Sequence, residues 1–131
     1  MEDSFKLEII SPEKIIFSNN TKMVTLPSYE GDMSVLKNHI SIITFLRPGI
    51  IKIQKDDNNF EEFFVEEGTV EFSNNTLIIL SSTITPLDSL TKEKISKMLE
   101  ESKNELGKDN LNDKARYILS HKLDLLLRIN Q

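Results

Sequence analysis

The sequence contains no cysteine and only four glycines and four prolines among its 131 residues. The absence of cysteine excludes disulfide bonds, thiolate metal sites and a cysteine nucleophile, and it permits a cytosolic location. No apolar run approaches the ~20 residues that a membrane-spanning helix requires. The first residues, 1–4, are acidic and lack the pattern of a signal or transit peptide. We therefore expect a protein that stays where it is made and meets a membrane only through another protein.

Recognisable catalytic and cofactor motifs are also missing. The histidines, His39 and His121, are far apart in sequence and have no further ligands at metal-site spacing. No glycine falls in a phosphate-binding loop or a nucleophile elbow. Acidic pairs occur at 61–62 and 66–67, but adjacent residues of a strand point to opposite faces. The sequence therefore predicts no catalytic residue, no metal site and no cofactor.

Charge is divided unevenly along the chain. The formal net charge is −5, which argues against a nucleic-acid partner because such proteins usually carry a basic surplus. Residues 1–88 have 14 acidic and 7 basic side chains, whereas residues 89–131 have 7 acidic and 9 basic ones. The two parts are therefore expected to face different partners.

Residues 1–86 have the pattern of short strands. Phe5, Leu7 and Ile9 alternate with polar residues, the period expected of a half-buried strand. Similar runs recur along this part, at 14–17, 23–26, 41–46, 50–54, 60–65, 69–72 and 77–80, and polar clusters such as 56–59 and 73–75 separate several of them. Many short strands with turns about every ten residues predict an all-β sandwich or barrel.

Residues 87–131 have a helical composition. Asp88 and Thr91 are the candidates for the N-cap of a first helix that ends near residue 105, and Gly107 begins a polar turn. A second helix has apolar residues at a period of about 3.6, namely Leu111, Ala115, Ile118, Leu119, Leu123, Leu126 and Ile129. The short link predicts an antiparallel hairpin. Because two such helices bury little by themselves, we expect an interaction arm that docks on the β domain or on a partner.

Three segments resemble the epsilon-subunit family of F-type ATP synthases. The first is similar to the family pattern G-E-[ML]-G-[IV]-L-P-x-H-x-P-L-[LIV]-x-x-[LI]-x-P-G, with matches at Gly31, Asp32, Met33, Val35, Leu36, His39, Ile42, Leu46, Pro48 and Gly49. Residues 64–80 resemble the family's [VI]-x-G-G-F-[LV]-E-V-x-x-[ND]-x-[VI]-T-[VI]-L, and residues 7–18 resemble its first hairpin. Usual glycines and prolines of the family are replaced at Ser34, Lys37, Ser41 and Glu67. The order and spacing of these segments extend the resemblance over essentially the whole chain.

The resemblance implies a fold and a set of partners. The implied fold is a β sandwich of about ten strands, residues 1–86, followed by a C-terminal antiparallel two-helix hairpin, residues 87–131. The implied function is that of a non-catalytic central-stalk subunit, which couples rotation of the membrane c-ring to the gamma subunit and the catalytic head during proton-driven ATP synthesis. In the family, an acidic loop residue meets the c-ring, and here the matching position is Asp32. The implied contact loop includes Gly31, Met33 and His39, with His39 as an anchor of the loop.

The resemblance also implies regulation by the hairpin. In many bacterial members the helices extend along gamma and present basic residues to acidic segments of the alpha/beta catalytic head, which blocks ATP hydrolysis. The matching candidates here are Lys114, Arg116, Lys122 and Arg128. The alternative interpretation of these residues is an ordinary solvated helix face.

One nucleotide-binding motif of the family is degenerate in this chain. Members that bind ATP carry [IL]-D-x-x-R-A at the first helix, and Asp88 matches its acidic position. Thr91 and Lys92 stand where arginine and alanine are usual. Without the planar guanidinium that would pair with a phosphate, we expect no specific ATP binding.

Two other classes of function compete with this interpretation. One is a free-standing β-sandwich module that binds a protein or a ligand and carries a helical tail. The other is a small hydrolase or isomerase, but the sequence offers no convergent set of residues for it. The resemblance places the protein at the cytoplasmic side of the bacterial inner membrane, as a peripheral subunit, and the missing transit peptide argues against the mitochondrial counterpart.

Overall fold

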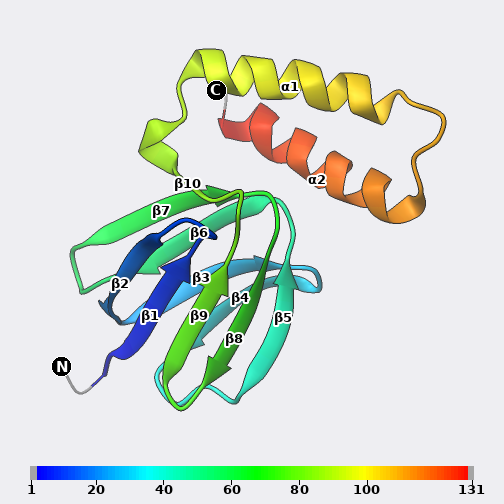
Figure 1. The fold of residues 1–131 in the computed structure, drawn as a ribbon. Helices are drawn as coiled ribbons and strands as arrows, with labels where there is room; N and C mark the ends of the chain where they lie inside the picture. Colours follow the sequence, from blue (N-terminus) through cyan, green and yellow to red (C-terminus); the bar gives the residue numbers. More distant parts are fainter. Residues whose placement is uncertain (1–2, 130–131) are drawn as a thin grey trace.

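The computed structural model describes residues 3–129, so Met1 and Glu2 of the acidic N-terminal segment lie outside the described residues. Strands come first along the chain and helices last (Figure 1). The strands are β1 (Phe5–Ile10), β2 (Ile15–Thr21), β3 (Met23–Ser28), β4 (Gly31–Leu36), β5 (Ile42–Leu46), β6 (Gly49–Gln54), β7 (Phe60–Val65), β8 (Gly68–Ser73), β9 (Thr76–Leu80) and β10 (Thr85–Pro86). A 3-10 turn, η1 (Leu87–Ser89), leads into the helices α1 (Lys92–Leu106) and α2 (Asp113–Ile129).

The ten strands form one curled sheet with two layers. Its order is β10-β7-β6-β3-β5-β8-β9-β1-β2, and β4 pairs with β3 off this path. The pairing of β1 with β9 is parallel and the other pairings are antiparallel. Only Ser28 and Leu46 pair between β3 and β5, so the sheet bends there and its halves face each other (Figure 1). The predicted β sandwich is confirmed.

Side chains from both layers fill a single core. In β1, Phe5, Leu7 and Ile9 point inward and are at most 3% exposed, as their alternation predicts. Phe5 meets Phe72 of β8 edge to face, with ring centroids 5.7 Å apart. Each fully buried aliphatic or aromatic side chain of this kind contributes about 1.5–3 kcal/mol to folding.

Strand β4 differs from the expectation. The implied contact loop began at Gly31 and no strand was predicted at 31–36, but these residues pair with β3 along its whole length. A two-residue turn, Tyr29 and Glu30, joins the strands, and Gly31 follows it with φ of 131°, a value that residues with a side chain rarely adopt. Met33 packs against the core and Val35 is buried, whereas the alternating polar residues Asp32 and Ser34 are exposed. The strand was missed because its alternation is short and begins with a glycine and an aspartate, both rare in strands.

The two helices form the expected antiparallel hairpin at one end of the sandwich (Figure 1). Thr91 is the N-cap of α1, because its side chain accepts a hydrogen bond from the Lys94 backbone N–H at 3.2 Å. Asn112 acts in the same way for α2, accepting from the Ala115 N–H at 2.7 Å. Gly107 ends α1 with φ of −77°, so it needs no left-handed conformation.

A second apolar cluster holds the hairpin on the sandwich. Phe64 of β7 points outward from the sheet and packs with Ile95 and Leu99 of α1 and with Leu125 and Leu126 of α2. The apolar face predicted for the second helix included Leu126 but not Leu125, which is 5% exposed. The division of the chain into 1–86 and 87–131 coincides with the change from strands to helices. That the two parts are separate folding units stays a prediction.

One hydroxyl of this hairpin is buried without a hydrogen-bond partner among the described residues. Ser102 of α1 is 2% exposed, and its Oγ has no hydrogen-bond partner among the described residues. Ser102→Ala is expected to raise the free energy of unfolding by about 1–2 kcal/mol, since it removes an unpaired polar group and improves helix propensity. Urea denaturation followed by circular dichroism measures this change.

The matched control is Ser96→Ala, at an exposed position of the same helix. It changes helix propensity in the same way without removing a buried hydroxyl. A gain from Ser96→Ala as large as that from Ser102→Ala would show that the buried hydroxyl carries no cost.

Candidate functional site

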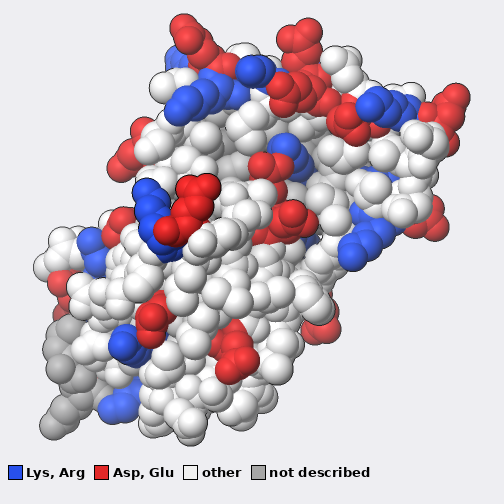
Figure 2. Space-filling model, in the orientation of Figure 1, with Lys and Arg blue, Asp and Glu red and all other residues white. Residues whose placement is uncertain are grey.

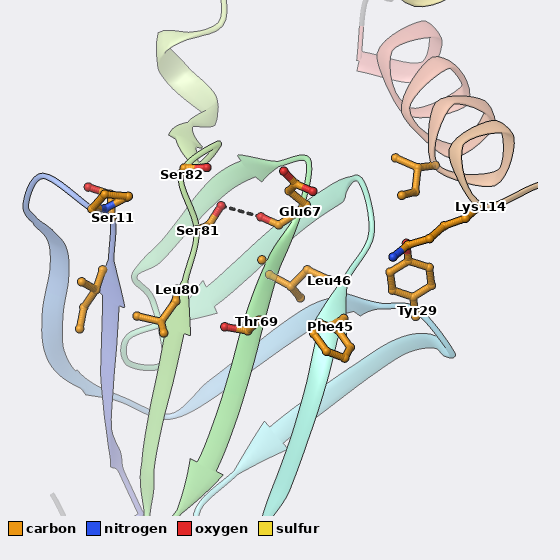
Figure 3. Close-up of a pocket in the computed structure, with 14 residues that line it drawn as sticks. Ser11, Tyr29, Phe45, Leu46, Glu67, Thr69, Leu80, Ser81, Ser82 and Lys114 are labelled. Carbon is orange, nitrogen blue, oxygen red and sulfur yellow. Dashed lines mark hydrogen bonds between the residues drawn. The ribbon is translucent and has the colours of Figure 1, made fainter. Parts of the chain in front are cut away.

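A groove lies between α2 and the sheet, and we call it the hairpin groove (Figure 3). Its volume is about 810 Å³. The sheet contributes residues at the ends of β1, β5, β8 and β9, and α2 contributes Lys114 and Ile118. Its volume is in the range of the ligand-binding clefts of proteins, and its lining is mainly apolar.

The floor of the hairpin groove is part of an unusually apolar sheet surface. Phe45 pairs with Thr69, Thr69 with Leu80, and Leu80 with Ile10, so these residues form one row across four strands. Phe45 is 59% exposed and Leu80 is 48% exposed. In the next row, Ile43 is 76% exposed. We call this surface, made of Ile10, Ile43, Phe45, Ile78 and Leu80, the outer apolar face.

Charge is sparse on this side of the sandwich, where Glu71 lies between Ile43 and Ile78 and Glu8 pairs with Ile78. In the space-filling view the surface of β1, β9, β8 and β5 is mostly uncharged, whereas charged side chains gather along the helices (Figure 2). Contiguous exposed apolar patches on soluble proteins commonly mark interaction sites. The outer apolar face is therefore a candidate protein-binding surface that continues into the hairpin groove.

Hydrogen bonds fix the polar rim of the groove. The Ser81 Oγ donates to the Glu67 carbonyl at 2.6 Å (Figure 3), and the Thr83 hydroxyl accepts from the Glu67 N–H at 3.2 Å. A Cβ on the adjacent Gly68 would lie 2.7 Å from the Leu80 carbonyl oxygen. Only glycine allows the two strands to approach so closely at this point.

Aromatic and ionic contacts fix the helical wall. The Tyr29 and Tyr117 rings are stacked with centroids 5.5 Å apart, and the Tyr117 hydroxyl donates to the Tyr29 carbonyl at 3.0 Å. His121 meets Tyr117 at 4.4 Å between ring centroids, and Lys122 forms an ion pair with Glu66. Burial raises the pKa of Tyr29, and the nearby Tyr117 and Glu67 raise it further. Tyr29 is therefore neutral at physiological pH and serves as a packing surface for α2.

Comparison with known proteins identifies the family. Residues 4–87 match the family model described as ATP synthase, Delta/Epsilon chain, beta-sandwich domain. A curated ATP synthase epsilon chain from Pelagibacter ubique (strain HTCC1062) is 40% identical over 131 residues, covering 99% of this chain and 100% of the relative. The chain belongs to the ATP synthase delta/epsilon family. The resemblance found in the sequence is confirmed.

Other relatives of the family give the same result. The ATP synthase epsilon chain of a Nitratiruptor species is 39% identical over 101 residues, covering 77% of this chain and 78% of that relative. A chain in the Euglena gracilis mitochondrial ATP synthase superimposes with a TM-score of 0.79 at 20% identity, covering 98% of this chain and 82% of that one. A central-stalk structure from Tetrahymena thermophila gives 0.62 at 16% identity, covering 96% of each chain. These two structures support the fold alone.

The residues that match the family's contact loop lie at the two ends of β4. Gly31, Asp32 and Met33 lie in β4 and not in a loop, which corrects the sequence-based expectation. Asp32 is 72% exposed in its side chain and lies 3.5 Å from an Arg47 guanidinium nitrogen, whereas Met33 points into the core. His39 follows the opposite end of β4, so Asp32 and His39 are separated by almost the full strand.

The local contacts of His39 support an anchoring role. Its Nδ1 lies 2.7 Å from the Ile40 carbonyl oxygen, and its ring meets Phe72 edge to face at 5.8 Å. Beside it, Asn38 and Asn75 exchange two hydrogen bonds of 2.7 and 3.1 Å, which join the β4–β5 connection to the β8–β9 turn. That His39 anchors a contact loop stays a prediction.

The four basic residues of α2 have different surroundings in this conformation. Lys122 is held by Glu66, and Arg116 reaches the Leu106 carbonyl at 3.4 Å. Lys114 lies over the hairpin groove (Figure 3), and Arg128 is exposed in the last turn. The docked hairpin therefore does not present them as one basic face.

The degenerate nucleotide motif forms a helix start in this structure. Asp88 is exposed in η1, and Thr91 is occupied in capping α1. Among residues 3–129, no three His, Cys, Asp or Glu side chains gather as a candidate metal site, and no helix is long and apolar enough to cross a membrane. The expectation of no specific ATP binding stays a prediction.

Sequence reasoning missed the hairpin groove. One signal of it was present, because β5 and β9 contain consecutive apolar residues, as in Ile42–Ile43 and Ile78–Leu80. A strand with one solvated face alternates polar and apolar residues, so a continuous apolar run indicates that both faces contact other surfaces.

Proposed function

We propose that this protein is the non-catalytic central-stalk subunit of an F-type ATP synthase, peripheral to the cytoplasmic side of the bacterial inner membrane. It couples rotation of the c-ring to the gamma subunit and the catalytic head during proton-driven ATP synthesis. The observation that carries the proposal is the outer apolar face in a chain of the delta/epsilon family. A rotor element needs rigidity and strong binding surfaces, which a two-layer sheet with one apolar outer face supplies.

The gamma subunit is the partner proposed for the outer apolar face. Its exposed aromatic and aliphatic side chains would be buried by a shaft that lies across β5, β8, β9 and β1. Copurification of the full chain with its own organism's gamma subunit tests this, with the affinity measured by calorimetry. Failure to bind gamma would favour the alternative, a free-standing β-sandwich binding module.

The c-ring is the partner proposed for the end of β4 that carries Asp32. The Asp32 carboxylate is exposed and can pair with basic groups on the polar loops of the ring. We expect Asp32→Arg to lower ATP-driven proton pumping in membrane vesicles several-fold and to leave hydrolysis by the detached catalytic head unchanged. The reason is that the substitution places like charges at the proposed contact.

Two further variants make the test of Asp32 specific. Glu62→Arg makes the same change in charge at an exposed position of β7, and it should pump as the wild type does. Asp32→Asn removes the carboxylate without adding a cation beside Arg47. Wild-type pumping in both Asp32 variants would exclude this contact.

The hairpin is proposed as a brake on ATP hydrolysis. Because Lys122 is paired with Glu66 and Lys114 lies over the hairpin groove, presenting these cations to the alpha/beta catalytic head requires α2 to leave the sandwich. The contacts of Tyr29, Tyr117 and Glu66 therefore favour the state in which hydrolysis is not blocked.

A further inference from the structure

We propose that one segment of the bound partner occupies the hairpin groove, contacts sandwich and hairpin together, and places a carboxylate against Lys114. This inference rests on the proposed function and adds a consequence to it. Binding of the partner to the sandwich and docking of the hairpin then stabilise each other.

The first support is the composite lining of the groove. Phe45 and Leu80 form the floor from the sheet, while Ile118 and Lys114 close the side from α2 (Figure 3). The groove is continuous with the outer apolar face, since Phe45 and Leu80 belong to both. A partner that covers this face and extends toward the helices enters the groove, whose volume of about 810 Å³ accommodates several apolar side chains.

The second support is the charge on the helical wall. Lys114 is the only basic residue in the lining and Glu67 the only acidic one, and neither belongs to an ion pair among residues 3–129. By contrast, Lys122 two turns later is held by Glu66. A cation at the edge of an apolar groove selects an apolar segment that carries an acidic side chain at the matching position.

The third support is the way α2 is positioned. The Tyr117 hydroxyl reaches the Tyr29 carbonyl and the two rings stack, so the wall that carries Lys114 and Ile118 depends on this pair. A partner that contacts this wall binds more tightly when the hairpin is docked. By thermodynamic reciprocity, the bound partner favours the docked hairpin by the same factor.

The experiment measures binding of gamma to the full-length chain by calorimetry. Lys114→Glu is expected to weaken binding about tenfold, because it places like charges together at the edge of a desolvated groove. Lys97→Glu, at an exposed position of α1 outside the groove, makes the same change in net charge and should leave affinity within about twofold. Equal losses in both variants would indicate general electrostatic attraction and would overturn the inference.

Reciprocity gives a second measurement. Gamma should slow hydrogen exchange of the α2 amides. Tyr117→Ala should weaken gamma binding. In the Tyr117→Ala background, Lys114→Glu should lower the affinity for gamma by a smaller factor than it does in the wild type. Unchanged α2 exchange on binding, or wild-type affinity of Lys114→Glu, would overturn the inference while leaving gamma as the partner of the outer apolar face. If the wild-type chain does not bind gamma at all, the proposed function itself fails.

Discussion

Phe45→Glu is expected to lower the affinity for the gamma subunit by about a hundredfold or more. Phe45 lies at the β5 end of the outer apolar face, beside Thr69 and two strands from Leu80, and it is 59% exposed, more than Leu80 at 48%. Loss of an aromatic anchor that an interface buries costs about 2–4 kcal/mol, and a buried unpaired carboxylate adds to this. Each 1.4 kcal/mol corresponds to about a tenfold change in affinity.

The fold itself offers a matched control for this substitution. Phe60 of β7 is 55% exposed, but it lies in the other layer of the sheet. Phe60→Glu therefore makes the same chemical change at a similar exposure and should leave gamma binding nearly unchanged. Both positions are exposed, so the free energy of unfolding should change by less than about 0.5 kcal/mol in each case. Wild-type affinity in Phe45→Glu would remove the outer apolar face from the proposed interface.

The sheet layers were predictable because strand periodicity depends on local sequence. Leu7 and Ile9 alternate with polar residues, and the strands around them face one core. The hairpin groove was not predictable in this way. Its floor brings together Ile10, Phe45 and Leu80, which are about 35 residues apart, and its wall comes from α2. The strand order that makes them neighbours is a property of the whole fold and leaves no local pattern.

The structure explains why glycine is required at two positions of the matched family motifs. Gly49 matches the final glycine of the first family pattern, and a Cβ there would lie 2.3 Å from the Pro27 Cβ. Gly68 is required by the nearby Leu80 carbonyl, whereas the preceding residue, Glu67, is exposed and tolerates a large side chain. The replacement of the first glycine of that pair therefore leaves the fold unchanged. Residues 31–33 were expected in a loop because a sequence motif does not show that its two ends lie at opposite ends of a strand.

Leu126→Ala is expected to cost about 2–5 kcal/mol and to loosen the hairpin from the sandwich. Leu126 is fully buried against a small cluster with Phe64, Ile95, Leu99 and Leu125. Loss of its side chain leaves a cavity at the centre of this contact, and the surrounding residues cannot close it without shifting a helix. Hydrogen exchange measures the result directly, as faster exchange of the α1 and α2 amides. The adjacent Leu127 is 45% exposed, so Leu127→Ala should cost less than about 1 kcal/mol.

The pattern of exchange in Leu126→Ala also tests the organisation of the chain. The sandwich has its own core, to which Leu126 does not belong, so amides in β1, β8 and β9 should keep their protection while the helices lose theirs. That result would establish residues 87–131 as a unit that can leave the sandwich, which a brake on hydrolysis requires. Equal loss of protection in strands and helices would mean that the two parts unfold together. The hairpin then could not act independently, and regulation by its release would be excluded.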